Sequence, residues 1–309
     1  MPLKPMIAVA LALLSGCASA PQTKSVLRAR PDELPRHASI DNVPFVEQTD
    51  NYCGPASMAM ILAWAGRPAS LEQLGSEMYT PGKKGTLQVD ILTAARRHGL
   101  LALPVNNLKD ILQEIAVGNP VLVFQNLAFS WYRQWHYAVA IGYDLDNETI
   151  LLHSGHSASV SMALPRFERT FNLGGDWAIA LLPPERLSGT ADEFSHLQAV
   201  AALEQVGENR AAEVAYGRIL KKWPNSLGAL LGQGNARFAL RDFTGALQAL
   251  RAATRLNSAM SAAWHNLAFV YQALKKTAKA KAAARRALQL VEARHSTEYR
   301  ESLDPILSP

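Results

Sequence analysis

The stretch DNYCGPASMAM, residues 50–60, places a cysteine at the start of a predicted helix. Gly54 and Pro55 follow Cys53, good helix formers come next, and Gly66 stands just past the expected end. Proline near the start and glycine beyond the end is the usual asymmetry of a helix. A cysteine in this position faces unpaired backbone N–H groups and the positive end of the helix dipole, and both favour a thiolate. Cys53 is therefore either a core residue or a nucleophile.

The composition indicates a folded chain with room for two modest domains. The chain has 309 residues, of which 49% are hydrophobic and 18% are charged. The net charge is +5, but Lys and Arg are scattered, and the richest basic stretch, residues 275–286, has helical spacing. This spacing favours a solvated helix face over a nucleic-acid site.

The first residues have the organisation of a secretory signal, because a lysine precedes an apolar run that is too short to span a bilayer. Leu14-Ser15-Gly16-Cys17 resembles the bacterial lipobox, in which a peptidase cuts before a cysteine that becomes lipidated. The resemblance implies a lipoprotein signal peptide over residues 1–16 and a chain anchored through Cys17. The next residue is Ala and not Asp, which in such lipoproteins implies the outer membrane, facing the periplasm. An ordinary signal peptide, cleaved after Ala18 or Ala20, is the alternative.

Residues 17–40, with several prolines and mixed charges, are predicted to form the lipid anchor and a linker. The chain has two cysteines, so lipidation of Cys17 leaves Cys53 without a disulfide partner. An unpaired thiol in an oxidising compartment is a liability unless it is buried or used in chemistry. The cysteine count alone leaves both interpretations of Cys53 open.

Residues 41–185 show helical patterns first and short apolar runs suited to strands later, an order that indicates an α+β domain. The turn-rich segment 144–147 joins two of the apolar runs and predicts a hairpin. The expected helices cover 56–64, a short segment opening at 70, 86–98 and 107–117, and the expected strands cover 120–124, 137–143, 149–152 and 177–182.

Residues 192–293 carry no strand pattern and repeat with a period of about 34 residues, as Ala212, Ala246 and Ala280 illustrate. The segment from Trp264 to Tyr271, followed by regularly spaced alanines, resembles a tetratricopeptide repeat. The resemblance implies an all-α solenoid whose groove takes an extended peptide or a helix from a protein partner or substrate. Three helical pairs are expected near 193–225, 227–259 and 261–293, followed by a tail at 294–309.

Gln48, the segment Asn51 to Ala56 and the segment His136 to Asp144 together resemble the bacteriocin-processing, double-glycine cysteine peptidase family, a branch of the papain-like superfamily. The resemblance runs over residues 41–185 and implies a papain-like cysteine peptidase domain. It implies Cys53 as the nucleophile, His136 as the general base and Gln48 as the oxyanion donor. The Cys-to-His spacing is shorter than in papain itself, which suits this branch.

The third member of the catalytic group departs from the family pattern. Relatives usually carry Asp-Pro on the strand after the histidine, where this chain has Leu152-His153-Ser154-Gly155. Asp144 is excluded, because it lies roughly 26 Å along the strand from His136 at about 3.3 Å per residue. We predict that His153 orients His136, since a neutral histidine can accept a hydrogen bond from the imidazole, with Ser154 and His156 as alternatives.

Together these features predict a lipid-anchored extracytoplasmic cysteine peptidase that hydrolyses a peptide bond through a thioester. Cleavage of leader peptides is not carried over from the family, because that reaction belongs to transporter-fused domains on the cytoplasmic side. The missing carboxylate leaves two alternatives, a weak or inactive peptidase-like scaffold that binds peptides, and acyl transfer to an amine. No cofactor and no metal are expected, since the histidines lack paired ligand spacing.

Overall fold

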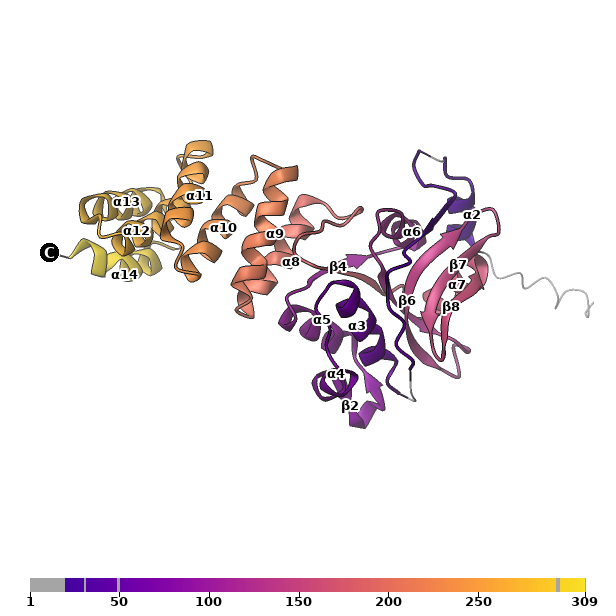
Figure 1. The fold of residues 1–309 in the computed structure, drawn as a ribbon. Coiled ribbons are helices and arrows are strands. Elements are labelled where there is room, and N and C mark those ends of the chain that lie inside the picture. Colours follow the sequence, from indigo (N-terminus) through magenta and orange to yellow (C-terminus); the bar gives the residue numbers. More distant parts are fainter. Residues whose placement is uncertain (1–19, 31, 49–50, 293–294, 309) are drawn as a thin grey trace, which may run out of the picture.

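The computed structural model describes residues 20–30, 32–48, 51–292 and 295–308. Figure 1 shows an elongated molecule with a sheet domain at one end and a helical array at the other. The predicted signal peptide and the predicted lipidation site Cys17 lie outside the described residues. Over the part of the chain that the structure describes, no helix has the length and apolar character needed to cross a membrane.

An antiparallel sheet forms the centre of the N-terminal domain, with strand order β4-β9-β5-β6-β7-β8. Strand β1 pairs with the second half of β6, beyond the part that β5 covers. Strands β2 and β3 form a separate short hairpin. The strands are β1 (His37–Ser39), β2 (Tyr79–Thr80), β3 (Gly85–Thr86), β4 (Leu101–Val105), β5 (Val121–Asn126), β6 (Trp135–Asp144), β7 (Thr149–Ser154), β8 (Ser157–Ala163) and β9 (Ala178–Leu182).

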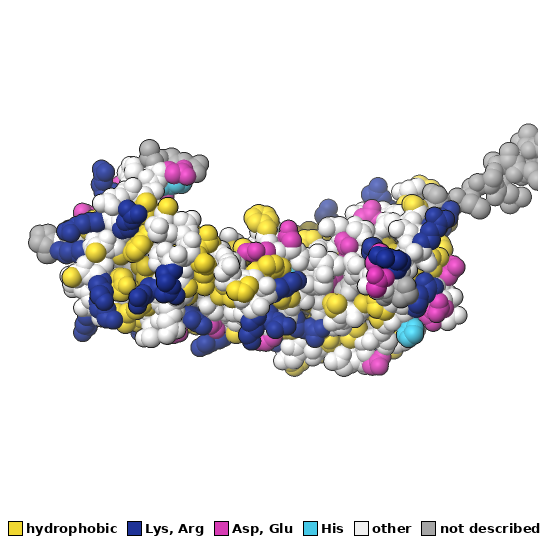
Figure 2. Space-filling view, turned by 90° about the horizontal axis from the view of Figure 1, so that it is seen from above, with side chains coloured by type: hydrophobic (Ala, Val, Ile, Leu, Met, Phe, Trp, Pro, Cys, Tyr) yellow, Lys and Arg dark blue, Asp and Glu magenta, His cyan; other side chains and the backbone are white. Residues whose placement is uncertain are grey.

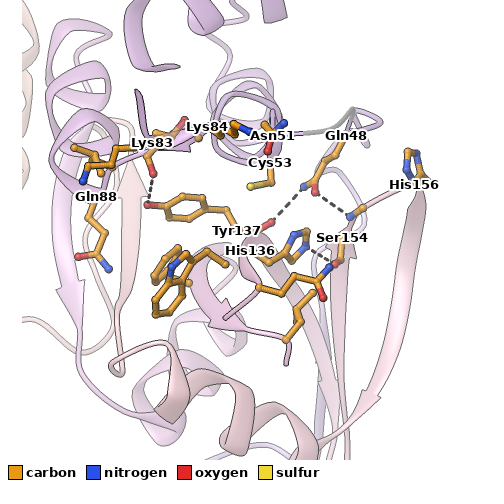
Figure 3. A pocket seen from close by; sticks show the side chains of 18 of the residues that line it. Gln48, Asn51, Cys53, Lys83, Lys84, Gln88, His136, Tyr137, Ser154 and His156 are labelled. Carbon is orange, nitrogen blue, oxygen red and sulfur yellow. Dashed lines mark hydrogen bonds between the residues drawn. The ribbon is translucent and has the colours of Figure 1, made fainter. Parts of the chain in front are cut away.

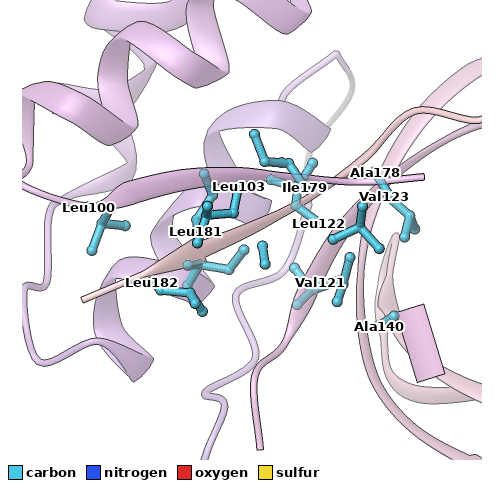
Figure 4. Close-up of a cluster of buried hydrophobic side chains, with 14 of the residues drawn as sticks. Leu100, Leu103, Val121, Leu122, Val123, Ala140, Ala178, Ile179, Leu181 and Leu182 are labelled. Atoms are coloured by element: carbon cyan, nitrogen blue, oxygen red, sulfur yellow. The ribbon is translucent and has the colours of Figure 1, made fainter. Parts of the chain in front are cut away.

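Helices cover this sheet so fully that β5 and β9 are buried at nearly every position. Helices α3 and α6 pack on β6, α5 packs on β4, and α7 packs on β5. Strands covered on both faces have continuous apolar runs, which explains the sequence pattern. Figure 4 shows the buried side chains where β4, β9 and β5 meet. The helices are α2 (Pro21–Leu27), α3 (Cys53–Trp64), α4 (Leu71–Met78), the 3₁₀ turn η1 (Pro81–Lys83), α5 (Gln88–Arg97), α6 (Leu108–Ala116) and α7 (Leu164–Leu173).

The predicted α+β fold class is confirmed. Several elements of the sheet domain are not predicted from the sequence, among them β4, β8 and α7. Strands β4 and β8 lie at the two ends of the strand order. Strand β4 contains Pro104 and β8 contains several serines, residues that an edge strand tolerates. The same residues weaken the sequence pattern by which a strand is predicted.

Residues 17–40 are predicted to form a linker, but the part of this segment that the structure describes is folded and packed against the domain. Helix α2 packs against α6 and α7. The buried carboxylate of Glu168 in α7 accepts hydrogen bonds from the backbone N–H groups of Gln22 and Thr23, at 3.0 and 2.7 Å. Composition alone misses these contacts, because they join residues far apart in the chain.

The C-terminal helices pack in the three predicted pairs, α8 with α9, α10 with α11 and α12 with α13. Close approach depends on small residues, since a Cβ on Gly234 would lie 2.6 Å from Cγ of Leu250. The predicted tail contains a further helix, α14, which buries Leu303 and Ile306 against the last pair and covers the end of the array. The helices are α8 (Glu193–Gln205), α9 (Asn209–Lys222), α10 (Leu227–Ala239), α11 (Phe243–Leu256), α12 (Ser261–Ala273), α13 (Thr277–Leu290) and α14 (Ser296–Leu307).

The basic stretch 275–286 lies mostly on the solvent side of α13. Ala280 and Ala284 are buried, whereas Lys279 and Arg285 are exposed. Figure 2 shows Lys and Arg side chains spread over the repeat half of the visible face. The solvated-face interpretation of this stretch therefore fits the structure.

A buried hydrogen-bond network joins the sheet domain to the repeats. The carboxylate of Glu114 in α6, fully buried, accepts from the backbone N–H of Thr190 at 2.9 Å and from its hydroxyl at 2.7 Å. The hydroxyl of Ser188 also donates to Glu114. The backbone N–H of Ser188 donates to Nε2 of the buried His196 in α8. The connection between the domains is thus fixed to α6.

Candidate active site

Cys53 and His136 line the same pocket, which has a volume of about 1120 Å³ (Figure 3). Its walls come from the start of α3, the β2–β3 hairpin with the start of α5, and the ends of β5, β6 and β7. The tertiary structure therefore brings together the two residues that the sequence proposes as nucleophile and base. Gln48 also lines this pocket.

Cys53 is the first residue of α3, and its place depends on the glycine after it. A Cβ on Gly54 would lie 2.5 Å from Oγ1 of Thr86, so a side chain there would push the β2–β3 hairpin away. Burial raises the pKa of the Cys53 thiol, while backbone N–H groups of Tyr137, Gly54 and Cys53 itself act in the opposite direction. The helix terminus was expected to favour a thiolate, but desolvation outweighs it, and the resting side chain is a neutral thiol.

His136 contacts the hydroxyl of Ser154, with Nε2 and Oγ 2.8 Å apart. Burial lowers the pKa of His136 to about 4, so the imidazole is neutral at pH 7. With Nε2 engaged by Ser154, Nδ1 is the ring nitrogen left to accept a proton from the thiol. Within the described residues no hydrogen bond joins Cys53 to His136, so thiol and imidazole form no preformed ion pair.

His153 does not orient His136, which corrects the prediction. It is buried, its Nε2 lies 2.9 Å from the carbonyl oxygen of Val43, and its Nδ1 accepts from the backbone N–H of Ser159. The reason is strand alternation: His153 stands opposite Val139, three residues from His136, and therefore faces the other side of the sheet.

The two alternatives to His153 differ in what they contact. Ser154, one residue along, reaches the His136 ring. His156 lies at the pocket edge, where its Nδ1 is 3.1 Å from a carboxylate oxygen of Glu47, and both side chains are largely exposed. Of the three candidates, Ser154 makes the contact that the role requires.

The side chain of Gln48 is buried and held by the turn between β7 and β8. Its Oε1 accepts from the backbone N–H of Gly155 at 3.0 Å, and its Nε2 lies 3.4 Å from the carbonyl oxygen of Tyr137 (Figure 3). Nε2 also lies 3.4 Å from the hydroxyl of Ser57. These two contacts of Nε2 are long, so its N–H bonds remain suited to a stronger acceptor. The role of Gln48 as oxyanion donor remains a prediction, and this geometry is compatible with it.

The pocket is positive at one end. Figure 3 places Lys83, Lys84 and Gln88 on one side of Cys53, and Gln48, Ser154 and His156 on the other. Among the described lining residues there is no Asp or Glu. Sequence reasoning missed this lysine pair, although two adjacent lysines in a Gly-rich turn, PGKKG at 81–85, are a visible signal.

Residues 40–178 match the family model of the Peptidase_C39 like family. This part of the chain is a C39-like peptidase domain. The match contains Gln48, Cys53, His136 and Ser154. No curated protein matches the chain.

Solved structures similar to parts of the chain are distant in sequence. A double glycine motif protease from an AMS/PCAT transporter, solved with its leader peptide, is 21% identical, and the match covers 47% of this chain and 93% of that chain with a TM-score of 0.36. The peptidase domain of ComA from Streptococcus, a bi-functional ABC transporter, is 23% identical, with coverage of 46% and 99% and a TM-score of 0.38. The first TPR of Spaghetti (RPAP3), bound to an HSP90 peptide, is 20% identical, with coverage of 38% and 94% and a TM-score of 0.33.

The helical array carries a smaller hollow of about 270 Å³. Apolar side chains from three successive helices, Phe238, Leu250 and Phe269, form part of its wall. Asn235 and Asn266 also line it, and Nδ2 of Asn266 donates to Oδ1 of Asn235 at 2.6 Å. The described residues contain no group of three His, Cys, Asp or Glu side chains arranged to hold a metal ion.

Proposed function

We propose that the chain is a lipid-anchored extracytoplasmic cysteine peptidase whose repeats bind a protein partner or substrate. The observation that carries the proposal is the shared pocket, in which Cys53 at a helix N-terminus, His136 and the amide of Gln48 meet. These residue types supply a nucleophile, a base and an oxyanion donor. The location, at the outer membrane and facing the periplasm, follows from the predicted lipidation of Cys17.

In the proposed reaction the Cys53 sulfur attacks the carbonyl carbon of a bound peptide while Nδ1 of His136 takes the thiol proton. The raised pKa of Cys53 and the lowered pKa of His136 disfavour a resting ion pair, so proton transfer accompanies attack. Gln48 Nε2 and a backbone N–H at the start of α3 donate to the oxyanion. The C–N bond breaks, His136 returns the proton to the leaving amine, and water then hydrolyses the thioester to a carboxylic acid and the free thiol.

Ser154 completes the proposed catalytic group as the residue that positions His136. When Nε2–H of His136 donates to Oγ of Ser154, Nδ1 is fixed as the basic nitrogen. A hydroxyl carries no charge, so it stabilises the imidazolium less than a carboxylate does. Modest catalytic rates follow from this difference.

A second function is favoured by the same electrostatics. A neutral thiol beside a weakly basic imidazole also suits a peptidase-like scaffold that binds peptides with little or no cleavage. The two functions share the pocket and the repeats and differ in whether the thioester forms.

The test is cleavage of a mixed peptide library by the full chain, with new termini identified by mass spectrometry. The proposal predicts new termini from the wild type and from Ser76→Ala, an exposed serine on α4, and none from Cys53→Ala. Peptides that bind the wild type but yield no new termini contradict the peptidase and support the scaffold. New termini that persist in Cys53→Ala contradict both functions, the peptidase that uses Cys53 and the scaffold that does not cleave.

A further inference from the structure

The connection between β5 and β6, residues 127–134, forms an exposed aromatic loop beside the catalytic pocket. Its tip carries Phe129, Trp131 and Tyr132, with 50%, 81% and 65% of their surfaces exposed. The rings of Phe129 and Trp131 stack with centroids 5.4 Å apart. Contiguous exposed aromatic side chains of this kind mark a contact surface.

The aromatic loop is held in shape by a buried side chain. Asn126 is 1% exposed, and its Nδ2 donates to the carbonyl of Phe129 at 3.1 Å. Its Oδ1 accepts from the backbone N–H groups of Ala128 and Gln134, at 3.2 and 2.9 Å. The exposed rings therefore stand on a preorganised turn.

The loop tip does not belong to the peptide pocket. Leu127, Gln134 and Trp135, at the base of the loop, line the pocket, whereas Phe129, Trp131 and Tyr132 do not. A peptide bound at Cys53 would therefore contact the base of the loop, but it does not account for the exposed rings at the tip.

Arginines lie beside both the tip and the base of the loop. The guanidinium of Arg169 lies over the ring of Phe129 at 5.8 Å, and that of Arg133 over the ring of Trp135 at 5.6 Å. Arg166 is exposed one turn before Arg169 on α7. Tryptophan and tyrosine with neighbouring arginines match the interface of an anionic bilayer, where the rings lie at the headgroup level and the cations meet lipid phosphates.

The N-terminal segment approaches the same part of the domain. Glu168, next to Arg169, binds the backbone of Gln22 and Thr23, and Figure 1 shows α2 and α7 together at the end of the domain away from the repeats. A lipid on Cys17 would be attached four residues before Pro21, a span of at most about 14 Å. A single lipid attachment point leaves a protein free to rotate, and a second contact fixes its orientation.

We propose that the aromatic loop, residues 127–134, contacts the bilayer surface and holds the mouth of the catalytic pocket against the membrane. The partner is a lipid bilayer with anionic headgroups. The inference rests on the proposed lipid anchor, concerns orientation on the membrane and does not depend on peptide cleavage.

The test measures the depth of Trp131 in vesicles of phosphatidylcholine and phosphatidylglycerol in equal parts, with and without brominated acyl chains. The full chain is compared with Trp131→Phe, and the difference in fluorescence isolates Trp131 from the other tryptophans. Trp264→Phe, on α12 in the repeats, is the matched control. The expected result is that brominated lipid quenches the Trp131 signal and that vesicles protect it from acrylamide, while the Trp264 signal changes in neither way.

Three outcomes overturn the inference. One is a Trp131 signal that stays open to acrylamide and unquenched by brominated lipid. Another is protection that appears on addition of a peptide substrate but not of vesicles, which assigns the tip to the substrate. A third is protection that depends on protein concentration without vesicles, which assigns it to a second copy of the chain. Trp131→Phe is expected to cleave soluble peptides at the wild-type rate, so failure here and failure of the proposed peptidase are distinguishable.

Discussion

Nε2 of His136 lies 2.8 Å from Oγ of Ser154, so a hydroxyl occupies the place where the family pattern calls for a carboxylate. The Ser154 hydroxyl carries no negative charge that would stabilise a protonated imidazole. Burial lowers the pKa of His136 to about 4. The site thus combines a cysteine and a weakly basic histidine in one pocket.

Replacing Ser154 with aspartate should raise the pKa of His136, because a carboxylate stabilises the imidazolium. We expect Ser154→Asp to raise kcat and to shift the acid limb of the pH–rate profile upward. Ser154→Ala should lower kcat by about tenfold, since the ring loses its positioning hydrogen bond. The comparison is Ser161→Ala, an exposed serine on β8. Equal profiles for Ser154→Ala, Ser154→Asp and wild type would show that Ser154 has no part in the reaction.

Alkylation of Cys53 should be slow at neutral pH and should rise only at alkaline pH, because burial raises the thiol pKa. The measurement is the rate of iodoacetamide labelling against pH, with the Cys53 peptide quantified by mass spectrometry. His136→Ala should leave the apparent pKa nearly unchanged, since the resting pair is neutral. A labelling pKa well below that of a free thiol, raised by His136→Ala, would show instead a resting thiolate–imidazolium pair.

The buried imidazole of His136 should make the fold acid-sensitive. Its pKa is about 4 in the folded chain against an ordinary 6.5, so between these values the unfolded chain binds more protons. The free energy of unfolding therefore falls as pH drops from 6.5 towards 4, by on the order of 3 kcal/mol in full. His136→Gln should flatten this part of the curve in urea titrations, whereas Ser157→Ala, at the exposed start of β8, should keep the wild-type slope. If His136→Gln left the pH dependence of the free energy of unfolding unchanged, the lowered pKa of His136 would be contradicted.

The lysine pair at one end of the pocket should select acidic peptides. Lys83→Glu combined with Lys84→Glu reverses the charge at this end while leaving the Cys53 side untouched. We expect kcat/KM for peptides with an acidic residue on that side to fall by about tenfold or more, because like charges then meet at the pocket. Cleavage of matched neutral peptides should change little. An equal loss for both peptide sets would point to distortion of the β2–β3 hairpin and not to charge.

Removing the Glu114 carboxylate should loosen the junction between the domains. Glu114→Ala leaves buried donors of Thr190, Ser188 and Asn119 without their acceptor, which costs about 2–3 kcal/mol. The expected result is a lower Tm and faster proteolytic cleavage near residues 188–191. Glu185→Ala, an exposed carboxylate nearby, serves as the control. Intact resistance to proteolysis in Glu114→Ala would show that apolar contacts alone hold the domains.

Elements whose signals are local could be predicted without any knowledge of the fold. The helix that begins at Cys53 and the apolar runs of β5 and β6 each depend on residues within a few turns or one strand. The repeats are visible as a period of about 34 residues along the chain. The motif around Cys53 and His136 likewise sufficed to propose the pair, and the structure places both in one pocket.

The choice between His153 and Ser154 required the fold, because the face of β7 that each residue occupies depends on the register of β7 against β6. The bulge between Ala140 and Gly142 shifts this register, and a shift of one residue exchanges the two faces. The proton affinities of Cys53 and His136 were also decided there, since desolvation arises from strands and helices distant in the chain. The same holds for α2 on Glu168, where a buried carboxylate and its donors are separated by 146 and 145 residues along the chain. A local sequence pattern cannot predict contacts between residues so far apart in the chain.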